Sequence, residues 1–206
     1  HKGSHSRLFR DFGRGKADVL IGTQMIAKGL HFPEVTLVGV LSCDASLNIP
    51  DFRASETTFQ LLTQVAGRAG RGTRAGEVIF QTLLPDHPLL HLAAHQDYLG
   101  FCQEELPIRQ HFGYPPFGHL VKIGASSLSE KLAFETLETF RKTLASHLPP
   151  HYEILPTLPA GHAKLKDHFR FHFLIKGPEL PPLLRALRPL AALAATLTLM
   201  PAHRVY

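Results

Sequence analysis

The sequence predicts an α/β fold in two parts, with a parallel sheet flanked by helices over residues 1–112 and a smaller α+β domain over residues 113–206. Short apolar runs alternate with helical patterns in the first part, which is typical of parallel sheets whose strands are joined by helices. The second part shows the element order βαββαβ, which is the order of a ferredoxin-like domain. Between the two parts, the residues Tyr-Pro-Pro-Phe-Gly at 114–118 have the composition of a linker.

The first part is expected to begin with a strand at 18–21 that ends at a glycine. A run rich in Val and Leu at 35–41 predicts a strand that is buried on both faces. A helix is predicted over 52–65, because a Pro-Asp pair directly before it is a helix start signal. The remaining elements of this part are a strand and two helices, expected at 77–81, 88–92 and 98–108.

In the second part, strands are predicted at 120–125, near 152–155, at 168–176 and at 196–200, and helices at 129–147 and 180–194. The strand at 168–176 has Phe and Ile at its odd positions and His, Arg, Leu and Lys at its even positions. Because successive side chains of a strand point to opposite faces, we expect one face to join the core and the other to be mostly basic.

Composition narrows the class of protein. Of the 206 residues, 44% are hydrophobic, which is enough for a core. The 22 Lys and Arg residues outnumber the 17 Asp and Glu residues, and this excess of positive charge favours a polyanionic partner such as nucleic acid. The two cysteines, Cys43 and Cys102, are far apart, which excludes a disulfide framework and a thiolate zinc module within the chain. We expect no membrane span, and because the chain starts with His rather than Met we expect an excised fragment.

The motif Gln-Val-Ala-Gly-Arg-Ala-Gly-Arg at 64–71 follows a predicted helix and places a glycine before each arginine. Guanidinium groups are permanently charged and bind phosphate oxygens in pairs, so they can stabilise the charge that develops on a transferred phosphoryl group. The alternative is a flexible Arg/Gly loop with general affinity for nucleic acid. The expected nucleotide-binding residues are Gln64, Gly67, Arg68, Gly70 and Arg71, of which Arg71, Arg68 and Gln64 are the expected catalytic residues.

A second motif lies at 18–29, where an expected strand is followed by Gly22 and the start of a helix. At such a junction the backbone N–H groups and the helix dipole point toward an anion. Thr23 and Gln24 add side-chain hydrogen bonds, which suits a DNA phosphate. The alternative is an ordinary turn between a strand and a helix that Thr23 caps.

In this order the two motifs resemble motifs V and VI of superfamily 2 helicases. The residues at 22–33, 51–56 and 64–71 are similar to those of the bacterial replication-restart helicase family PriA, also called primosomal protein N′, and the likeness continues through 76–90 and 115–117. The resemblance implies a second RecA-like helicase lobe followed by the family's C-terminal domain. It also implies ATP-driven 3′-to-5′ unwinding, recognition of forked DNA and primosome assembly in the bacterial cytoplasm at the nucleoid.

Carried over by position, the resemblance implies that the Gln and Arg residues of 64–71 face ATP. It implies that the junction at 18–29 contacts DNA, through Gly22, Thr23, Gln24 and Lys28. The implied partners are forked and single-stranded DNA, the single-stranded DNA-binding protein and other primosome proteins.

Three features of the family are absent from this sequence: a P-loop, an acidic Mg²⁺ box and a cysteine-rich zinc module. The Gly-Arg-Gly-Lys run at 13–16 is followed by Ala17, so the P-loop spacing fails. We therefore expect ATP and Mg²⁺ to bind only in the parent protein, where a first lobe completes the site, and zinc to be held by the parent outside this chain. The chain alone is not expected to hydrolyse ATP.

The basic side of the strand at 168–176 is a second candidate DNA-binding surface. Arg170 lies on it, and Lys164 and Lys166 come just before the strand. The alternative is a solvated sheet face with no ligand. The resemblance implies that this domain engages DNA and the acidic tail of the single-stranded DNA-binding protein.

The histidines do not predict a metal site. Two in the strand at 168–176 would lie about 13 Å apart along it, too far to share one ion. Three others have helical spacing, but a proline interrupts them and no carboxylate or thiolate completes a set; these are His87, His91 and His95.

Two other functions stay open: a non-catalytic module that binds DNA or a partner during primosome assembly, and a lobe of a related superfamily 2 translocase that does not unwind.

Overall fold

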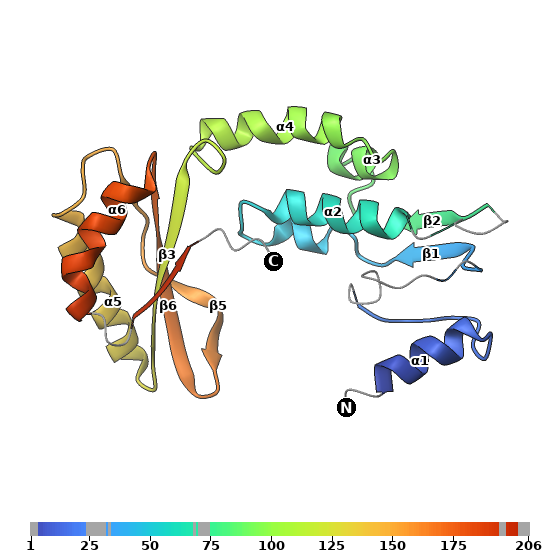
Figure 1. Cartoon of the computed structure of the whole chain (residues 1–206), viewed down its shortest axis with the longest axis horizontal. Helices are drawn as coiled ribbons and strands as arrows, with labels where there is room; N and C mark the ends of the chain where they lie inside the picture. Colours follow the sequence, from blue (N-terminus) through green and yellow to red (C-terminus); the bar gives the residue numbers. More distant parts are fainter. Residues whose placement is uncertain are drawn as a thin grey trace. The chain divides into compact units, whose positions relative to one another are not determined.

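The computed structural model describes residues 4–23, 32, 34–67, 69, 75–193 and 197–201 (Figure 1). The chain divides into two compact units, His1–Glu105 and Leu106–Tyr206. The division falls inside the helix α4 (Tyr98–His111), whereas the sequence predicts a junction after residue 112. The helix is shared because Phe101 at its start packs into the core of the first unit, while Arg109 near its end donates a hydrogen bond to the Pro115 carbonyl oxygen.

The first unit contains two parallel strands joined by a helix. The strands β1 (Leu37–Val40) and β2 (Glu77–Phe80) pair in register, and α2 (Ala54–Ala66) lies between them in the chain. Parallel strands need such a crossover because the end of one strand and the start of the next lie at opposite ends of the sheet. The predicted strands at 35–41 and 77–81 and the predicted helix at 52–65 are therefore confirmed.

One apolar core holds this unit together. Phe59 and Leu62 on one side of α2 are 3% and 0% exposed, and the Phe59 ring stacks on Phe101 at 4.4 Å between ring centroids. The helix α3 (Pro88–Ala94) packs against the same core and starts at a proline, as expected, with the His87 ring nitrogen accepting a hydrogen bond from the Leu89 N–H. The fully or nearly buried apolar residues are Cys43, Phe59, Leu62, Leu89, Leu90, Ala93 and Phe101.

Two predictions for this unit are wrong. Residues 18–21 form no strand, and the side chains of Val19 and Ile21 are 72% and 89% exposed, because no described strand pairs with them. β1 is not buried on both faces: Val40 packs against the core, but Leu37 is 57% exposed. Exposed positions alternate with partly buried ones along both strands, and Ile79 of β2 is also 49% exposed.

Two elements of this unit have no counterpart in the prediction. The helix α1 (Ser4–Gly13) has an apolar and a basic side, and its Phe12 ring meets the Phe32 ring edge to face at 4.9 Å. A short 3-10 helix, η2 (Ala45–Asn48), follows β1 and contacts α2 through a hydrogen bond between the Ser46 and Thr58 hydroxyl groups at 2.8 Å. None of the helices in the described part of the chain is long and apolar enough to cross a membrane.

The second unit is an antiparallel sheet. Its strands are β3 (His119–Ser127), β4 (Glu153–Ile154), β5 (Leu158–Leu165), β6 (His168–Gly177) and β7 (Leu197–Pro201). They lie in the order β4–β6–β3–β7, with β5 also paired to β6. The four predicted strands are confirmed, whereas β5 was not predicted.

Helices cover one face of this sheet (Figure 1). The helix α5 (Glu130–Ala145) buries Ala133, Leu137, Phe140 and Leu144, and α6 (Leu180–Leu187) packs against the same core. The helix expected to run to residue 194 changes at Arg188 to the 3-10 helix η3 (Arg188–Leu193), because Pro189 lacks the N–H that a continued α-helix needs.

The alternation in β6 is confirmed. Phe173 and Ile175 are 1% and 0% exposed and belong to the core under the helices. Residues at the even positions lie on the face that carries neither α5 nor α6, which we call the helix-free face of the sheet.

Candidate functional site

The carboxyl end of α2 is the described part of the expected nucleotide site. α2 ends at Gly67, whose N–H donates to the Thr63 carbonyl oxygen at 3.0 Å. Burial of Phe59 and Leu62 fixes the rotation of the helix, so that Gln64 in the last turn is exposed and free to meet a ligand. The expected catalytic residues Arg68 and Arg71, and also Gly70, lie outside the described residues.

The start of α2 is fixed by a side-chain contact. The Asp51 carboxylate accepts hydrogen bonds from Nε and Nη2 of Arg53, at 3.0 and 2.9 Å, and from the Arg53 backbone N–H at 2.9 Å. The hydrogen bond with Asp51 raises the pKa of the Arg53 guanidinium. Both side chains are more than a third exposed, so this pair orders the segment at 51–56 more than it stabilises the fold.

The carboxyl ends of β1 and β2 are tied together by two polar side chains. Asp44, only 7% exposed, accepts a hydrogen bond from the Leu83 N–H at 3.2 Å, and the Gln81 side chain accepts one from the Ser42 N–H at 2.6 Å. Ligands of parallel sheets gather at this edge. Asp44 therefore helps to hold this edge together.

The second motif is described only at its beginning. Gly22 and Thr23 are exposed and belong to no helix or strand, while Gln24 and Lys28 lie outside the described residues. Among the described residues, no hydrogen bond joins Gly22 or Thr23 to Gln64.

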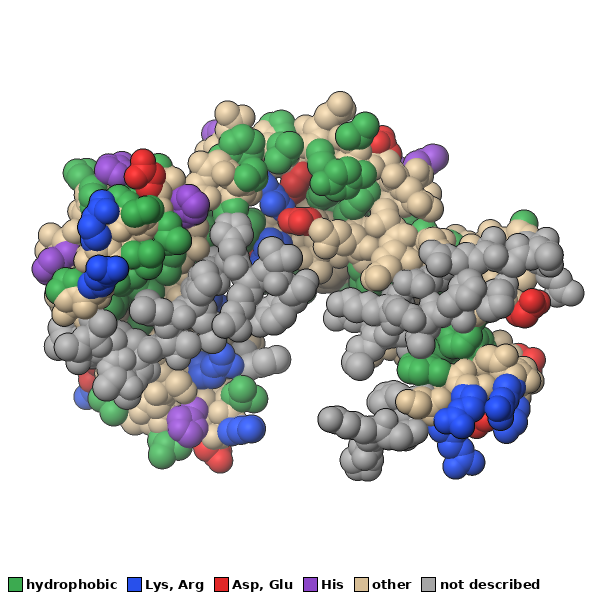
Figure 2. Space-filling view, viewed as in Figure 1, with side chains coloured by type: hydrophobic (Ala, Val, Ile, Leu, Met, Phe, Trp, Pro, Cys, Tyr) green, Lys and Arg blue, Asp and Glu red, His purple; other side chains and the backbone are tan. Residues whose placement is uncertain are grey.

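Basic side chains gather over α1 (Figure 2). Asp11 bonds to Lys16 at 3.1 Å and lies 3.8 Å from Arg7, and the hydrogen bond from Lys16 lowers the pKa of the Asp11 carboxyl. These contacts are exposed, which is typical of a solvated charged helix face. No role for this helix is predicted from the sequence.

The structure separates the three basic residues expected to bind DNA in the second unit. Lys164 pairs in register with Phe169 and places its ammonium 5.2 Å from that ring, so it lies on the opposite side of the β5–β6 hairpin from Arg170. Lys166 is at the hairpin turn, where it and Asp167 have φ angles of 48° and 64°. Lys164 also forms an exposed ion pair with Asp167 at 3.4 Å.

Two of the three histidines with helical spacing make local hydrogen bonds. The His87 ring caps α3, and Nδ1 of His95 lies 2.8 Å from the His91 carbonyl oxygen. Across the residues that the structure describes, no three side chains of His, Cys, Asp or Glu come together as a metal site would need.

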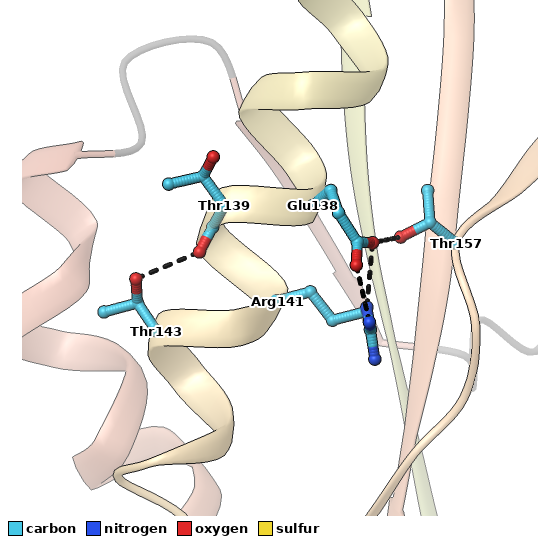
Figure 3. Close-up of polar contacts among 5 residues, drawn as sticks. All are labelled: Glu138, Thr139, Arg141, Thr143 and Thr157. Carbon is cyan, nitrogen blue, oxygen red and sulfur yellow. Dashed lines mark hydrogen bonds and ion pairs between the residues drawn. The ribbon is translucent and has the colours of Figure 1, made fainter.

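A groove in the second unit contains a partly buried ion pair, drawn in Figure 3, that is not predicted from the sequence. Glu138 of α5 accepts hydrogen bonds from Nη2 and Nε of Arg141 at 2.6 and 2.9 Å and from the Thr157 hydroxyl at 2.9 Å. The groove is lined by Phe134, Glu138, Arg141, Lys142, Ile154, Pro156 and Thr157. Mainly through the Arg141 hydrogen bonds, the pKa of the Glu138 carboxyl falls to about 2.

Glu138 is expected to make the second unit less stable in acid. A carboxyl with a lowered folded pKa stabilises the fold above its unfolded pKa, so the contribution present above pH 4.5 is lost as pH falls toward about 2. Because the side chains of Glu138 and Arg141 are 20% and 26% exposed, we expect Glu138→Gln to cost about 1–2 kcal/mol near pH 7 and less below pH 3. Urea unfolding at several pH values measures both effects.

Glu135→Gln is the matched control, since Glu135 is on the same helix and its ion pair with Lys131 is 3.9 Å long and exposed. It should change the free energy of unfolding by less than about 0.5 kcal/mol. Equal effects of the two substitutions would contradict the role assigned to Glu138.

Comparison with known proteins adds family information to this geometry. The family described as "Helicase conserved C-terminal domain" matches residues 1–73, and the family described as "Primosomal protein N C-terminal domain" matches residues 110–203. The replication restart protein PriA of Chlamydia pneumoniae is 47% identical over 193 residues, which cover 94% of this chain and 26% of that protein.

Proteins of the same name from two more bacteria are also similar. That of Bacillus subtilis is 47% identical over 85% of this chain and 22% of its own length, and that of Thermotoga maritima is 35% identical over 85% of this chain and 24% of its own length. The chain thus spans about a quarter of the length of these relatives.

Proposed function

Because this chain belongs to the family of the replication restart protein PriA, as a C-terminal part of it, we propose that it is part of an ATP-dependent 3′-5′ DNA helicase that recognises forked DNA and restarts replication by primosome assembly. One observation carries the proposal: the Gln/Arg motif at 64–71 falls inside the region that matches the conserved C-terminal domain of helicases. Activity, substrates and partners belong in this proposal to the whole protein.

The two units fit this proposal in their architecture. The parallel pair β1 and β2, joined through α2, supports a partial RecA-like lobe in the first unit. The strand order β4–β6–β3–β7, with antiparallel pairing and helices on one face, supports a ferredoxin-like arrangement in the second. We propose the domain boundary near residue 112, where the linker segment begins.

In the proposed nucleotide site, Gln64 contacts the γ-phosphate or the attacking water, and Arg68 and Arg71 neutralise the developing charge. Gly67 and Gly70 let the backbone approach the triphosphate. The exposure of Gln64 at the end of α2 supports this role. ATP and Mg²⁺ are held mainly by a P-loop and an acidic box that this sequence does not contain, and zinc is held by another part of the parent.

The proposed DNA contacts lie in both units. In the first they are made by the segment from Gly22 to Lys28, and in the second by basic side chains of the β5–β6 hairpin and its sheet. The net charge of +5 supports a polyanionic partner. The other proposed partners are the single-stranded DNA-binding protein and primosome proteins, in the bacterial cytoplasm at the nucleoid.

The test is strand displacement by the full-length protein on a forked duplex. We expect unwinding that requires ATP and starts from 3′ single strands, whereas the 206-residue chain alone shows no DNA-stimulated ATP hydrolysis. Movement along DNA without unwinding would favour a related translocase. DNA binding without ATP turnover by the full-length protein would favour a non-catalytic binding module.

A further inference from the structure

The helix-free face of the second unit has a patch of bare backbone surrounded by polar side chains. Gly124 of β3 lies directly opposite His172 of β6, and Ser126 lies opposite Arg170. Opposite residues of an antiparallel pair, and residues two apart on one strand, share a face, so Lys122 also lies beside this patch. We call these five residues the Gly124 patch.

The charge of the Gly124 patch is uncompensated. Lys122 and Arg170 are half-buried and have no carboxylate partner within the described chain. Further along the same face, Lys176 of β6 is paired at 2.7 Å with Glu153 of β4, and β5 places the uncharged Leu158 opposite His172. Lys122 and Arg170 lie four residues apart along the sheet, on either side of His172, and both place positive charge around its imidazole. A bound anion between them would offset that charge.

His172 lies between these cations. Its Nδ1 atom is shielded from solvent and makes no hydrogen bond with the residues that the structure describes. Burial, and then the charges of Lys122 and Arg170, lower the pKa of the His172 imidazole to about 4. The ring is therefore neutral near pH 7, and an anion beside it would oppose the part of this pKa shift that comes from the two cations.

The missing side chain at Gly124 limits what kind of anion fits the patch. The absence of a side chain at Gly124 lets a ligand reach the sheet, and the nearest atoms that an added Cβ would meet are the Phe171 carbonyl oxygen at 3.3 Å and the Cβ of His172 at 3.9 Å. An open sheet with an imidazole beside two cations suits a phosphate and the planar base attached to it. An acidic peptide would gain charge contacts here but no apolar pocket.

We propose that the Gly124 patch binds one phosphodiester group of a single-stranded nucleic acid, and that His172 takes up a proton from solution when this anion binds. The proposal rests on DNA binding by the whole protein and adds a site and a pH dependence to it. A bound anion raises the imidazole pKa toward its ordinary value, so binding should tighten as pH falls from 7.5 to 5.5, by up to about tenfold if the pKa returns fully to about 6.5.

The test uses the 206-residue chain and a fluorescein-labelled thymidine oligonucleotide, titrated at fixed salt from pH 7.5 to pH 5.5. His172→Gln keeps a polar group but cannot take up a proton, so its affinity should lose most of the pH dependence and change less than about threefold at pH 7.5. Lys122→Gln should weaken binding at every pH and lower the slope of log K against log salt by about 0.7, as expected for one phosphate contact on a single strand.

His147→Gln is the matched control, because His147 is exposed after the end of α5, on the helix-covered side of the core. It should keep the pH dependence of the unchanged chain. Calorimetry in buffers of different ionisation enthalpy should show proton uptake on binding by the chain and its loss in His172→Gln.

Three results would overturn the site: no oligonucleotide binding, equal pH dependence in His172→Gln and the unchanged chain, or unaltered affinity in Lys122→Gln. Tight binding of an acidic decapeptide instead of the oligonucleotide would assign the patch to an acidic partner and overturn it as well. ATP-dependent unwinding by the full-length protein is measured separately, so failure of the patch is distinguishable from failure of the helicase proposal.

Discussion

Replacing Arg71 by alanine in the full-length protein is expected to lower the turnover number of DNA-stimulated ATP hydrolysis about a thousandfold or more. An arginine that contacts the transferred phosphoryl group stabilises charge that appears mainly in the transition state, and such arginines are worth about 10³–10⁵ in rate. Because the effect is concentrated in the transition state, the KM for ATP and the affinity for forked DNA should change far less. Steady-state ATPase assays with saturating forked DNA measure all three quantities.

Two further variants separate this role from a general loss of positive charge. Arg71→Lys should recover little activity, since an ammonium group cannot bind two phosphate oxygens in the planar geometry of a guanidinium. Arg7→Ala removes a charge from the same unit at an exposed position on α1, where the side chain is 83% exposed, and should leave turnover unchanged. A drop of less than tenfold in Arg71→Ala would contradict the proposed role.

The elements that the sequence predicts correctly are those whose pattern is local. The helix at 52–65 and the alternation in β6 follow from residues within one element, and both are confirmed. The motif at 64–71 also depends only on residue types and spacing, and its nucleotide-binding role stays a prediction.

What the sequence does not predict depends on contacts between distant segments. Residues 18–21 have a strand composition, but a strand needs a paired neighbour and no described segment supplies one. β5 contains Pro159 and Gly161 and does not alternate, so only its pairing with β6 makes it a strand. The register of that pairing, with a shift between Pro159 and Lys164, also places Lys164 and Arg170 on opposite faces.

The same argument applies to the Gly124 patch. Lys122 is distant in sequence from His172, and only the antiparallel register of β3 and β6 brings them to one face. The sequence pattern predicts that one side of β6 is basic. It does not predict that Lys122 and Gly124 of β3 lie on the same face, because that depends on how the two strands pair.

Replacing Phe173 by alanine is expected to lower the free energy of unfolding of the second unit by about 3–5 kcal/mol. Phe173 is 1% exposed, and its ring belongs to the core formed by β3, β6 and the two helices. Its removal exposes apolar surface and leaves a cavity that the surrounding side chains fill only in part. Since domains are stable by about 5–15 kcal/mol, this loss is a large fraction of the total. Urea unfolding followed by far-UV circular dichroism measures it.

Phe169→Ala is the matched control, because Phe169 points to the same side of β6 but is only half-buried near the hairpin. We expect it to cost about 1 kcal/mol, since the cost of removing a side chain follows the apolar area that it buries. If Phe173→Ala leaves the unit unfolded, Phe173→Leu keeps most of the volume and should cost about 1–1.5 kcal/mol. Equal losses from Phe169→Ala and Phe173→Ala would mean that the alternation of β6 does not decide which side chains hold the core together.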